Sequence, residues 1–200
     1  MSKTFTARRA LSAGIAAFAA LVFAAACSDD SGEEGNDMDS MESESATDAE
    51  FNDADVTFAQ MMIPHHEQAV DMAELAQGQA ADAEVIALAD EIAAAQQPEI
   101  DQMTALLEEW GQPLEMEGHE GMSMGGMATE EQMTELGAAQ GADFDKLFVE
   151  LMIAHHEGAI TMAEEHHAEG QNADAAAIAT AVIDAQTAEI ATLQEIQARL

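Results

Sequence analysis

Two pairs of adjacent histidines are the side chains in this sequence best suited to chemistry, because an imidazole can bind a metal ion or transfer a proton near neutral pH. The pairs are His65-His66 and His155-His156. Each pair is flanked along the chain by two methionines, which are Met62, Met72, Met152 and Met162. Imidazole and thioether donors without a thiolate suit Cu(I) best, whereas the imidazoles alone would also accommodate Cu(II) or Zn(II).

Ordinary packing is the competing explanation for each of these residues taken alone. Methionine commonly fills irregular cores, and a single buried histidine is more often hydrogen-bonded than metal-bound. Burying two adjacent imidazoles costs roughly a few kcal/mol of desolvation unless each finds a partner. This sequence accepts that cost at two matching places, which favours a binding role over packing alone.

The histidine pairs belong to a duplicated segment with a constant offset of 90 residues. Residues 58–74 align with residues 148–164 and share the pattern Met-Ile-x-His-His-Glu-x-Ala. The offset continues without a gap through the pairs Gln96/Gln186, Glu99/Glu189 and Ile100/Ile190. Internal repetition of this length indicates a duplicated architecture.

Each repeat has the apolar periodicity of a helical hairpin. The predicted helices span residues 53–77, 82–110, 143–169 and 174–200. Glycines follow the first three of them as stop signals, and Pro64 should kink the first helix or make it begin afresh. Neither hairpin can bury its apolar stripe alone. We therefore expect an all-α fold, an antiparallel four-helix bundle of residues 51–200 whose halves, about 51–110 and 141–200, are related by a pseudo-twofold axis.

The duplicated helix carries its candidate ligands on the face that must meet the core. At 100° per residue, one stripe of the first repeat contains Phe58, Met61, Met62, His65, Ala69, Met72 and Ala76. The corresponding stripe of the second repeat places His155 inside as well. Glu67, Asp71 and Glu74 fall on the opposite face, which we expect to meet water.

A methionine-rich connection joins the repeats over residues 111–129. It contains Met116, His119, Met122, Met124 and Met127 among several glycines. A loop of this length is uncommon unless it is functional or disordered, and methionines in a solvated loop cannot be core. The spacing would let successive thioethers converge on one soft ion, and the alternative is a flexible linker of biased composition. His166-His167 could add nitrogen ligands, and a frayed helix end is the alternative for that pair.

The N-terminus has the pattern of an export signal. Lys3 and Arg8-Arg9 precede an uncharged apolar run, residues 10–26, that ends in small residues before Cys27. This order predicts a signal peptide over 1–26 of the lipoprotein type, with diacylation of Cys27, although Ala24 stands where lipoboxes usually carry leucine. Ordinary secretion is the alternative. Residues 27–50 are acidic and polar and predict a disordered tether.

Charge and cysteine content exclude whole classes of function. The 200 residues include 40 acidic and 5 basic side chains, a net charge of −35, so nucleic-acid binding is excluded and membrane contact is expected only through a lipid anchor. Cys27 is the single cysteine, which rules out intramolecular disulfides and cysteine metal cages.

The doubled Met-Ile-x-His-His pattern, followed by Ala and Met-Ala, resembles the domain-of-unknown-function family 305 over about residues 50–200. This resemblance implies a ferritin-like bundle and a relation to periplasmic copper-binding proteins implicated in copper resistance. It also implies a ligand set in each repeat, which comprises Met62, His65, His66 and Met72, and Met152, His155, His156 and Met162. Leu151 stands where the first repeat has Met61, so the repeats need not bind alike.

Three functions therefore compete. The first is an exported, lipid-anchored protein of the cell envelope that sequesters copper or hands it to a partner of unknown identity. The second is an oxidase, either di-iron or cuprous. The di-iron site needs Glu-x-x-His on two helices, whereas the only match is Glu164-x-x-His167, and Gln77 stands at the repeat equivalent of His167. The third is a metal-free envelope protein that binds a partner. We expect a binding protein and not an enzyme.

Overall fold

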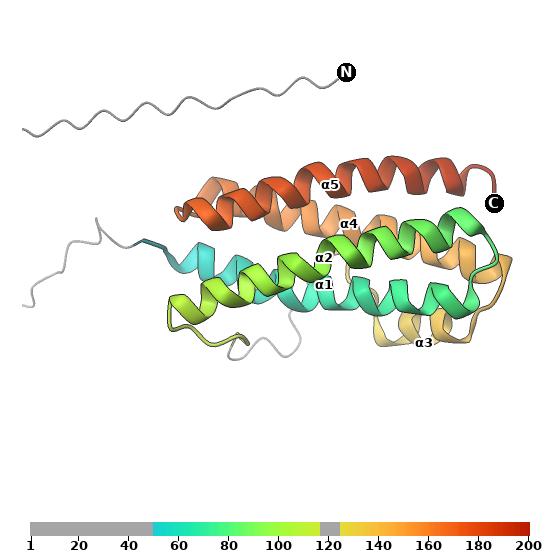
Figure 1. The fold of residues 1–200 in the computed structure, drawn as a ribbon, viewed down its shortest axis with the longest axis horizontal. Coiled ribbons are helices and arrows are strands. Elements are labelled where there is room, and N and C mark those ends of the chain that lie inside the picture. The colour runs from blue at the N-terminus through green and yellow to red at the C-terminus, as the bar shows by residue number, and fades with distance from the viewer. Residues whose placement is uncertain (1–49, 117–124) are drawn as a thin grey trace, which may run out of the picture. The chain divides into compact units, whose positions relative to one another are not determined.

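A computed structural model describes residues 50–116 and 125–200 of the chain (Figure 1). The described residues form five helices and no strand, which confirms the predicted all-α class. The helices are α1 (Asp53–Gln79), α2 (Ala83–Glu109), α3 (Glu130–Ala138), α4 (Ala142–Glu169) and α5 (Ala173–Gln197). The predicted signal peptide, Cys27 and nearly all of the tether lie outside the described residues.

The four long helices form two hairpins that meet along one shared interface. Helix α1 packs most extensively against α2, and α4 against α5, while α1 and α4 join the two hairpins (Figure 1). Neighbouring long helices run in opposite directions. The short helix α3 contacts α1 and α4. No helix in the described ranges is both long and apolar enough to span a membrane.

The ends of the long helices follow the local capping chemistry. Asn52 caps α1 with a capping box, and the side chains of Asp82 and Asn172 cap α2 and α5. The predicted bounds were correct to within about two residues at most ends. Helix α1 does not begin afresh at Pro64, which lies inside one continuous helix, and it passes through Gly78 before it ends at Gln79. Helix α3 was not predicted.

Two buried carboxylates clasp the hairpins together at equivalent positions of the repeats. Asp55 of α1 accepts the backbone N–H groups of Gln171 and Asn172 in the turn between α4 and α5. Asp145 of α4 accepts the backbone N–H groups of Ala81 and Asp82 in the turn between α1 and α2. Each hairpin therefore holds the turn of the other, which fixes the register of α1 against α4.

The pKa of Asp55 reflects this clasp. Burial alone would raise the pKa of this carboxyl group, but hydrogen bonds from the backbone of Asn52, the ring of His166 and the backbone of the α4–α5 turn together lower it. The buried carboxylate is therefore charged at neutral pH, and two of the contacts that lower its pKa, those from Gln171 and Asn172, also tie α1 to the turn before α5.

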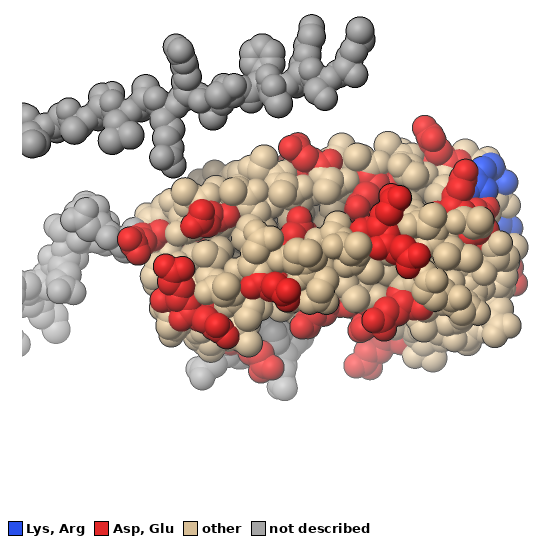
Figure 2. Space-filling view, in the orientation of Figure 1, with Lys and Arg blue, Asp and Glu red and all other residues tan. Residues whose placement is uncertain are grey.

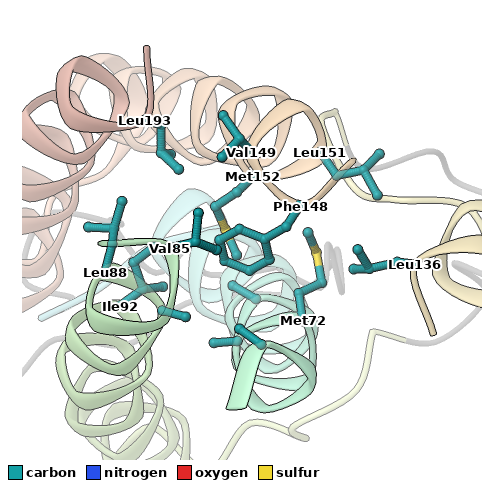
Figure 3. Packing of buried hydrophobic residues seen from close by; sticks show 14 of the residues in the cluster. Met72, Val85, Leu88, Ile92, Leu136, Phe148, Val149, Leu151, Met152 and Leu193 are labelled. Carbon is teal, nitrogen blue, oxygen red and sulfur yellow. The ribbon is translucent and has the colours of Figure 1, made fainter. Parts of the chain in front are cut away.

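The interior consists of two hydrophobic clusters separated by polar residues. All four long helices contribute to both clusters, and the first includes Met72, Phe148, Met152 and Leu193 (Figure 3). The second cluster includes Phe58, Met62 and Met162. Along each long helix, buried polar side chains lie between the residues of the two clusters. We call them the central polar layer, and they are His65, His66, Gln96, His155, His156 and Gln186.

Acidic side chains are spread over the visible surface, while the visible basic side chains gather at the end where the C-terminus lies (Figure 2). Arg199 forms ion pairs there with Asp82 and Glu84. The side chains of Glu67, Asp71 and Glu74 are exposed, as the helical stripe predicted. Such a surface attracts cations over several ångströms and repels anionic lipid and nucleic acid.

Candidate metal centre

The four paired histidines are completely buried where α1 and α4 meet. The rings of His65 and His155 approach each other across this interface, with centroids 3.8 Å apart and planes tilted by 42°. The sequence placed these two rings inside, and the structure confirms that. It also buries His66 and His156, which lie about a quarter-turn away on the same helices.

Two carboxylates hold the outer pair of rings in equivalent ways. His66 Nε2 donates to Glu99 Oε2 at 2.8 Å, and His156 Nε2 lies 2.7 Å from Glu189 Oε2. The second contact is as short as the first but less well aligned for a hydrogen bond. Both carboxylates lie on the second helix of their own hairpin and are about one-sixth exposed, at 16% and 15%. Metal-binding histidines commonly show this arrangement, in which a carboxylate fixes the ring tautomer.

A backbone carbonyl holds a third ring. His65 Nε2 lies 3.1 Å from the carbonyl oxygen of Gly125, a geometry that suits donation from the ring. The segment around Gly125 is fastened to α1 by Gln68, whose side-chain amide bonds the backbone N–H and C=O of Ala128. Gly158 of α4 makes this approach possible, because a Cβ at that position would lie 1.9 Å from the Gly125 carbonyl oxygen. The end of the methionine-rich connection thus contacts the central polar layer.

Many polar atoms of the layer have no hydrogen-bond partner among the described residues. They are Nδ1 of His65, His66, His155 and His156, Nε2 of His155, both amide atoms of Gln96 and Gln186, and Nε2 of His156, which has only its close contact with Glu189. Each buried donor or acceptor without a partner costs about 1–3 kcal/mol. A protein that accepts this cost repeatedly in one layer holds lone pairs ready for a ligand. Imidazole lone pairs suit soft and borderline metal ions, so the residues present fit copper.

Burial keeps the two central rings neutral. Desolvation lowers the pKa of His65 to about 4, partly opposed by the Gly125 hydrogen bond and helped by the electrostatic influence of the neighbouring His66 and His156 rings. Desolvation, with the electrostatic influence of the three other imidazoles, lowers the pKa of His155 to about 2. These rings therefore carry free lone pairs at neutral pH, and a proton competes poorly with a metal ion for them.

Nitrogen and oxygen donors alone do not complete a coordination sphere. Within residues 50–116 and 125–200, no three His, Cys, Asp or Glu side chains converge closely enough to hold a metal ion. Thioethers are the remaining candidates, and Met62 and Met152 lie one helical turn before His65 and His155, fully buried. Met72 and Met162 lie about two turns beyond the same histidines, within the hydrophobic clusters. By their position along the helices, Met62 and Met152 are nearer to the histidines than Met72 and Met162 are.

The candidate ligands of the connection are only partly described. Met116 and Met127 are half-buried, whereas His119, Met122 and Met124 lie outside the described residues. His166 differs from the frayed helix end considered above, because it is buried and its ring contacts Asp55. His167 is exposed.

Sequence reasoning missed the glutamines and carboxylates that share the layer. Gln96, Gln186, Glu99 and Glu189 are identical at the 90-residue offset, so the signal was present in the repeat itself. Gly125 and Gly158 carry no comparable signal, because the first repeat has Gln68 where the second has Gly158.

Solved structures with the same fold connect the chain to known proteins. A Streptomyces coelicolor DUF305 protein described as secreted is 31% identical, with 73% of this chain and 93% of that one covered and a TM-score of 0.68. A Deinococcus radiodurans DUF305 fragment is also 31% identical. The match covers 74% of this chain and 98% of the fragment, with a TM-score of 0.68.

CopM, a protein solved in Cu(I)-bound, Cu(II)-bound and Ag-bound forms, is similar as well. In its Cu(I)-bound form it is 30% identical to this chain. The match covers 70% of this chain and 93% of CopM, with a TM-score of 0.61. A comparison with curated proteins found no match. The family model described as "Domain of unknown function (DUF305)" matches residues 55–197, and the chain therefore belongs to the DUF305 family.

Proposed function

We propose that this protein binds copper outside the cytoplasm, with Cu(I) favoured, and sequesters it or hands it to another protein. The observation that carries this proposal is the set of buried Nδ1 atoms without a partner in the described residues. Three of these rings, those of His65, His66 and His156, present Nε2 to an oxygen atom, which orients the ring and leaves Nδ1 for a metal ion.

Cu(I) is favoured because the donors beside the imidazoles are thioethers. Met62 and Met152 are buried one turn from the central rings, and thioether sulfur binds Cu(I) in preference to Zn(II). The similarity to CopM, which has been solved with Cu(I), Cu(II) and Ag, supports the same class of ion. The methionines of the connection would add ligands, since its end already contacts His65.

Binding is proposed in preference to catalysis. The four imidazoles are fully buried and share their layer with two buried glutamines, which leaves little room for a second substrate beside the ion. We propose that the scaffold is an antiparallel four-helix bundle of the ferritin-like type. The packing of α1 on α2, α4 on α5 and α1 on α4 supports this arrangement.

Export and lipid anchoring at Cys27 complete the proposal. The basic, apolar and small-residue order of the N-terminus supports them, as does the similarity to a DUF305 protein described as secreted. The acidic residues 27–50 would then hold the helical domain away from the membrane surface.

A competition titration against a Cu(I) chelator tests the function. The double variant His65→Leu/His155→Leu removes the two central rings and keeps the layer filled, so its Cu(I) affinity should fall at least about 100-fold. The exposed His167→Ala is the matched control and should bind as the wild type does. Equal Cu(I) affinity in the double variant and the wild type would reject the central polar layer as the copper site.

A further inference from the structure

A second cluster of soft donors lies away from the central polar layer, where α1 begins and α4 ends. A pocket of about 270 Å³ opens there. Its lining includes Phe58, Met61, Met162 and His166, with the acidic side chains of Asp53, Glu165 and Glu169. We call this region the pocket end. It lies at the opposite end of α1 from α3 (Figure 1).

His166 is the polar side chain buried in this pocket. It is 3% exposed, and its Nε2 lies 2.7 Å from Asp55 Oδ1. Asp55 accepts further hydrogen bonds from the backbone N–H groups of Asn52, Gln171 and Asn172, so the ring nitrogen is the donor in this contact. The other ring nitrogen, Nδ1, is buried and has no partner among the described residues. A carboxylate on one nitrogen and a bare lone pair on the other is the usual state of a metal-binding histidine.

The first repeat supplies an internal control for the clasp. Asp145 holds the α1–α2 turn as Asp55 holds the α4–α5 turn, with two backbone N–H groups and no histidine. Ala76 stands at the repeat equivalent of His166 and is fully buried. The clasp therefore does not require an imidazole, and folding alone does not explain why His166 is buried.

Two thioethers share the pocket with this ring. Met61 is half-buried and Met162 is 9% exposed. Their repeat equivalents are Leu151 and Met72, which pack with Leu136 of α3 in the first hydrophobic cluster (Figure 3). The end of the molecule that carries α3 is thus filled by apolar side chains. At the pocket end, two of the equivalent positions carry a thioether and an imidazole instead of leucine and alanine.

We propose that His166 Nδ1 and the thioethers of Met61 and Met162 form a second site for a soft monovalent cation, Cu(I) or Ag(I). The acidic rim of Asp53, Glu165 and Glu169 raises the local cation concentration, while the sulfur and nitrogen donors select a soft ion from that population. This site does not require that the central polar layer bind metal. It also assigns Met162 to the pocket end and not to the central polar layer.

Ag(I) is the probe for the test, because it binds the same donors as Cu(I) without redox chemistry. The variant Met61→Leu/His166→Ala places at each position the residue that the other repeat carries there, Leu151 and Ala76, so the fold should be retained. We expect it to bind one Ag(I) fewer than the wild type, and the wild-type Met162 methyl resonance shift on Ag(I) addition should disappear. His167→Ala is the control and should lose neither.

The outcomes separate this site from the proposed function. His65→Leu/His155→Leu should keep the Met162 shift, whereas Met61→Leu/His166→Ala should keep binding at the central polar layer. If circular dichroism shows that the double variant is unfolded, Met61→Leu alone gives the answer, through at least a tenfold weaker Ag(I) dependence of the Met162 methyl shift. An unchanged Ag(I) stoichiometry, or a Met162 shift that persists in a folded variant, would overturn the proposal.

Discussion

The pocket end and the α3 end of the helical assembly are built from equivalent positions of the two repeats, yet their chemistry differs. At the α3 end, Leu151 and Ala76 belong to a closed hydrophobic cluster, while Met61 and His166 occupy the equivalent positions at the pocket end. The central polar layer shows the opposite behaviour, because each of its buried polar residues has an identical counterpart. The α3 end shows that an apolar residue can fill each of these positions in a folded structure. A metal-binding role therefore explains the thioether and the imidazole at the pocket end better than packing does.

The largest expected effect concerns the central polar layer and pH. The unfolded chain protonates His65 and His155 near pH 6.5, whereas in the folded state burial holds their pKa at about 4 and about 2. Below pH 6.5 the folded state binds fewer protons than the unfolded state does. The contribution of each ring to the free energy of unfolding is therefore present above pH 6.5 and is lost as pH falls. Between pH 7 and pH 4 the loss should reach about 3 kcal/mol per histidine.

Urea unfolding of the metal-free protein across this pH range measures the effect. The His65→Leu/His155→Leu variant is the reference, because it differs from the wild type only at these two rings. The difference in unfolding free energy between variant and wild type should grow as pH falls. A difference that stays constant from pH 7 to pH 4 would show that these rings are not held neutral by burial.

The next largest effect is a difference in stability between alanine substitutions at two helical glycines, one in each repeat. Gly158→Ala would push a methyl group into the backbone of Gly125, and we expect a loss of about 1–3 kcal/mol in unfolding free energy. Gly78→Ala meets nothing within 4 Å, and we expect a gain of about 0.5–1 kcal/mol from helix propensity. Thermal unfolding measures both, and similar shifts in the two variants would contradict the close packing of the connection on α4.

The symmetry of the central polar layer predicts equal effects of two further substitutions. Glu99→Gln and Glu189→Gln each remove the carboxylate that faces an outer imidazole, and each should weaken Cu(I) binding by about 10–100-fold. The exposed Glu91→Gln is a control on α2 and should change the affinity little. Chelator competition measures all three, and a loss confined to one of the two repeats would break the symmetric interpretation.

The smallest effect distinguishes the two sites by salt. The central polar layer is buried, so Cu(I) affinity there should change little in 1 M salt, where the Debye length is about 3 Å. The pocket end depends on an exposed acidic rim, and its Ag(I) affinity should fall several-fold under the same conditions. Titrations of the two double variants, one for each site, measure these dependences. Equal salt dependence would argue that the rim does not assist binding.

Much of the fold followed from local and periodic signals. The 90-residue offset, the apolar stripe and the capping residues predicted the four long helices and the burial of His65 and His155. Those properties depend on residues close together in the sequence or on the repeat itself. Helix α3 was not predicted, because it is short and because its single buried residue, Leu136, gives no periodic signal.

The parts of the site that the sequence did not predict depend on contacts between segments far apart in the chain. The ring of His166 meets Asp55 across 111 positions of sequence, and Gly125 meets His65 across 60. Their spacing reveals nothing until the packing of α1 on α4 is known. Gln96 and Gln186 match each other in the repeat, but their burial in the layer depends on how α2 and α5 pack.

The crossed clasps of Asp55 and Asp145 have a consequence for the origin of this molecule. A single hairpin that carried one such aspartate and one such turn could form both contacts with a second copy of itself, as in an isologous homodimer. The present chain is then equivalent to that dimer with its subunits covalently fused. Covalent fusion allows the two halves to differ, so an imidazole and a thioether can stand at one end while the equivalent positions at the other end are apolar.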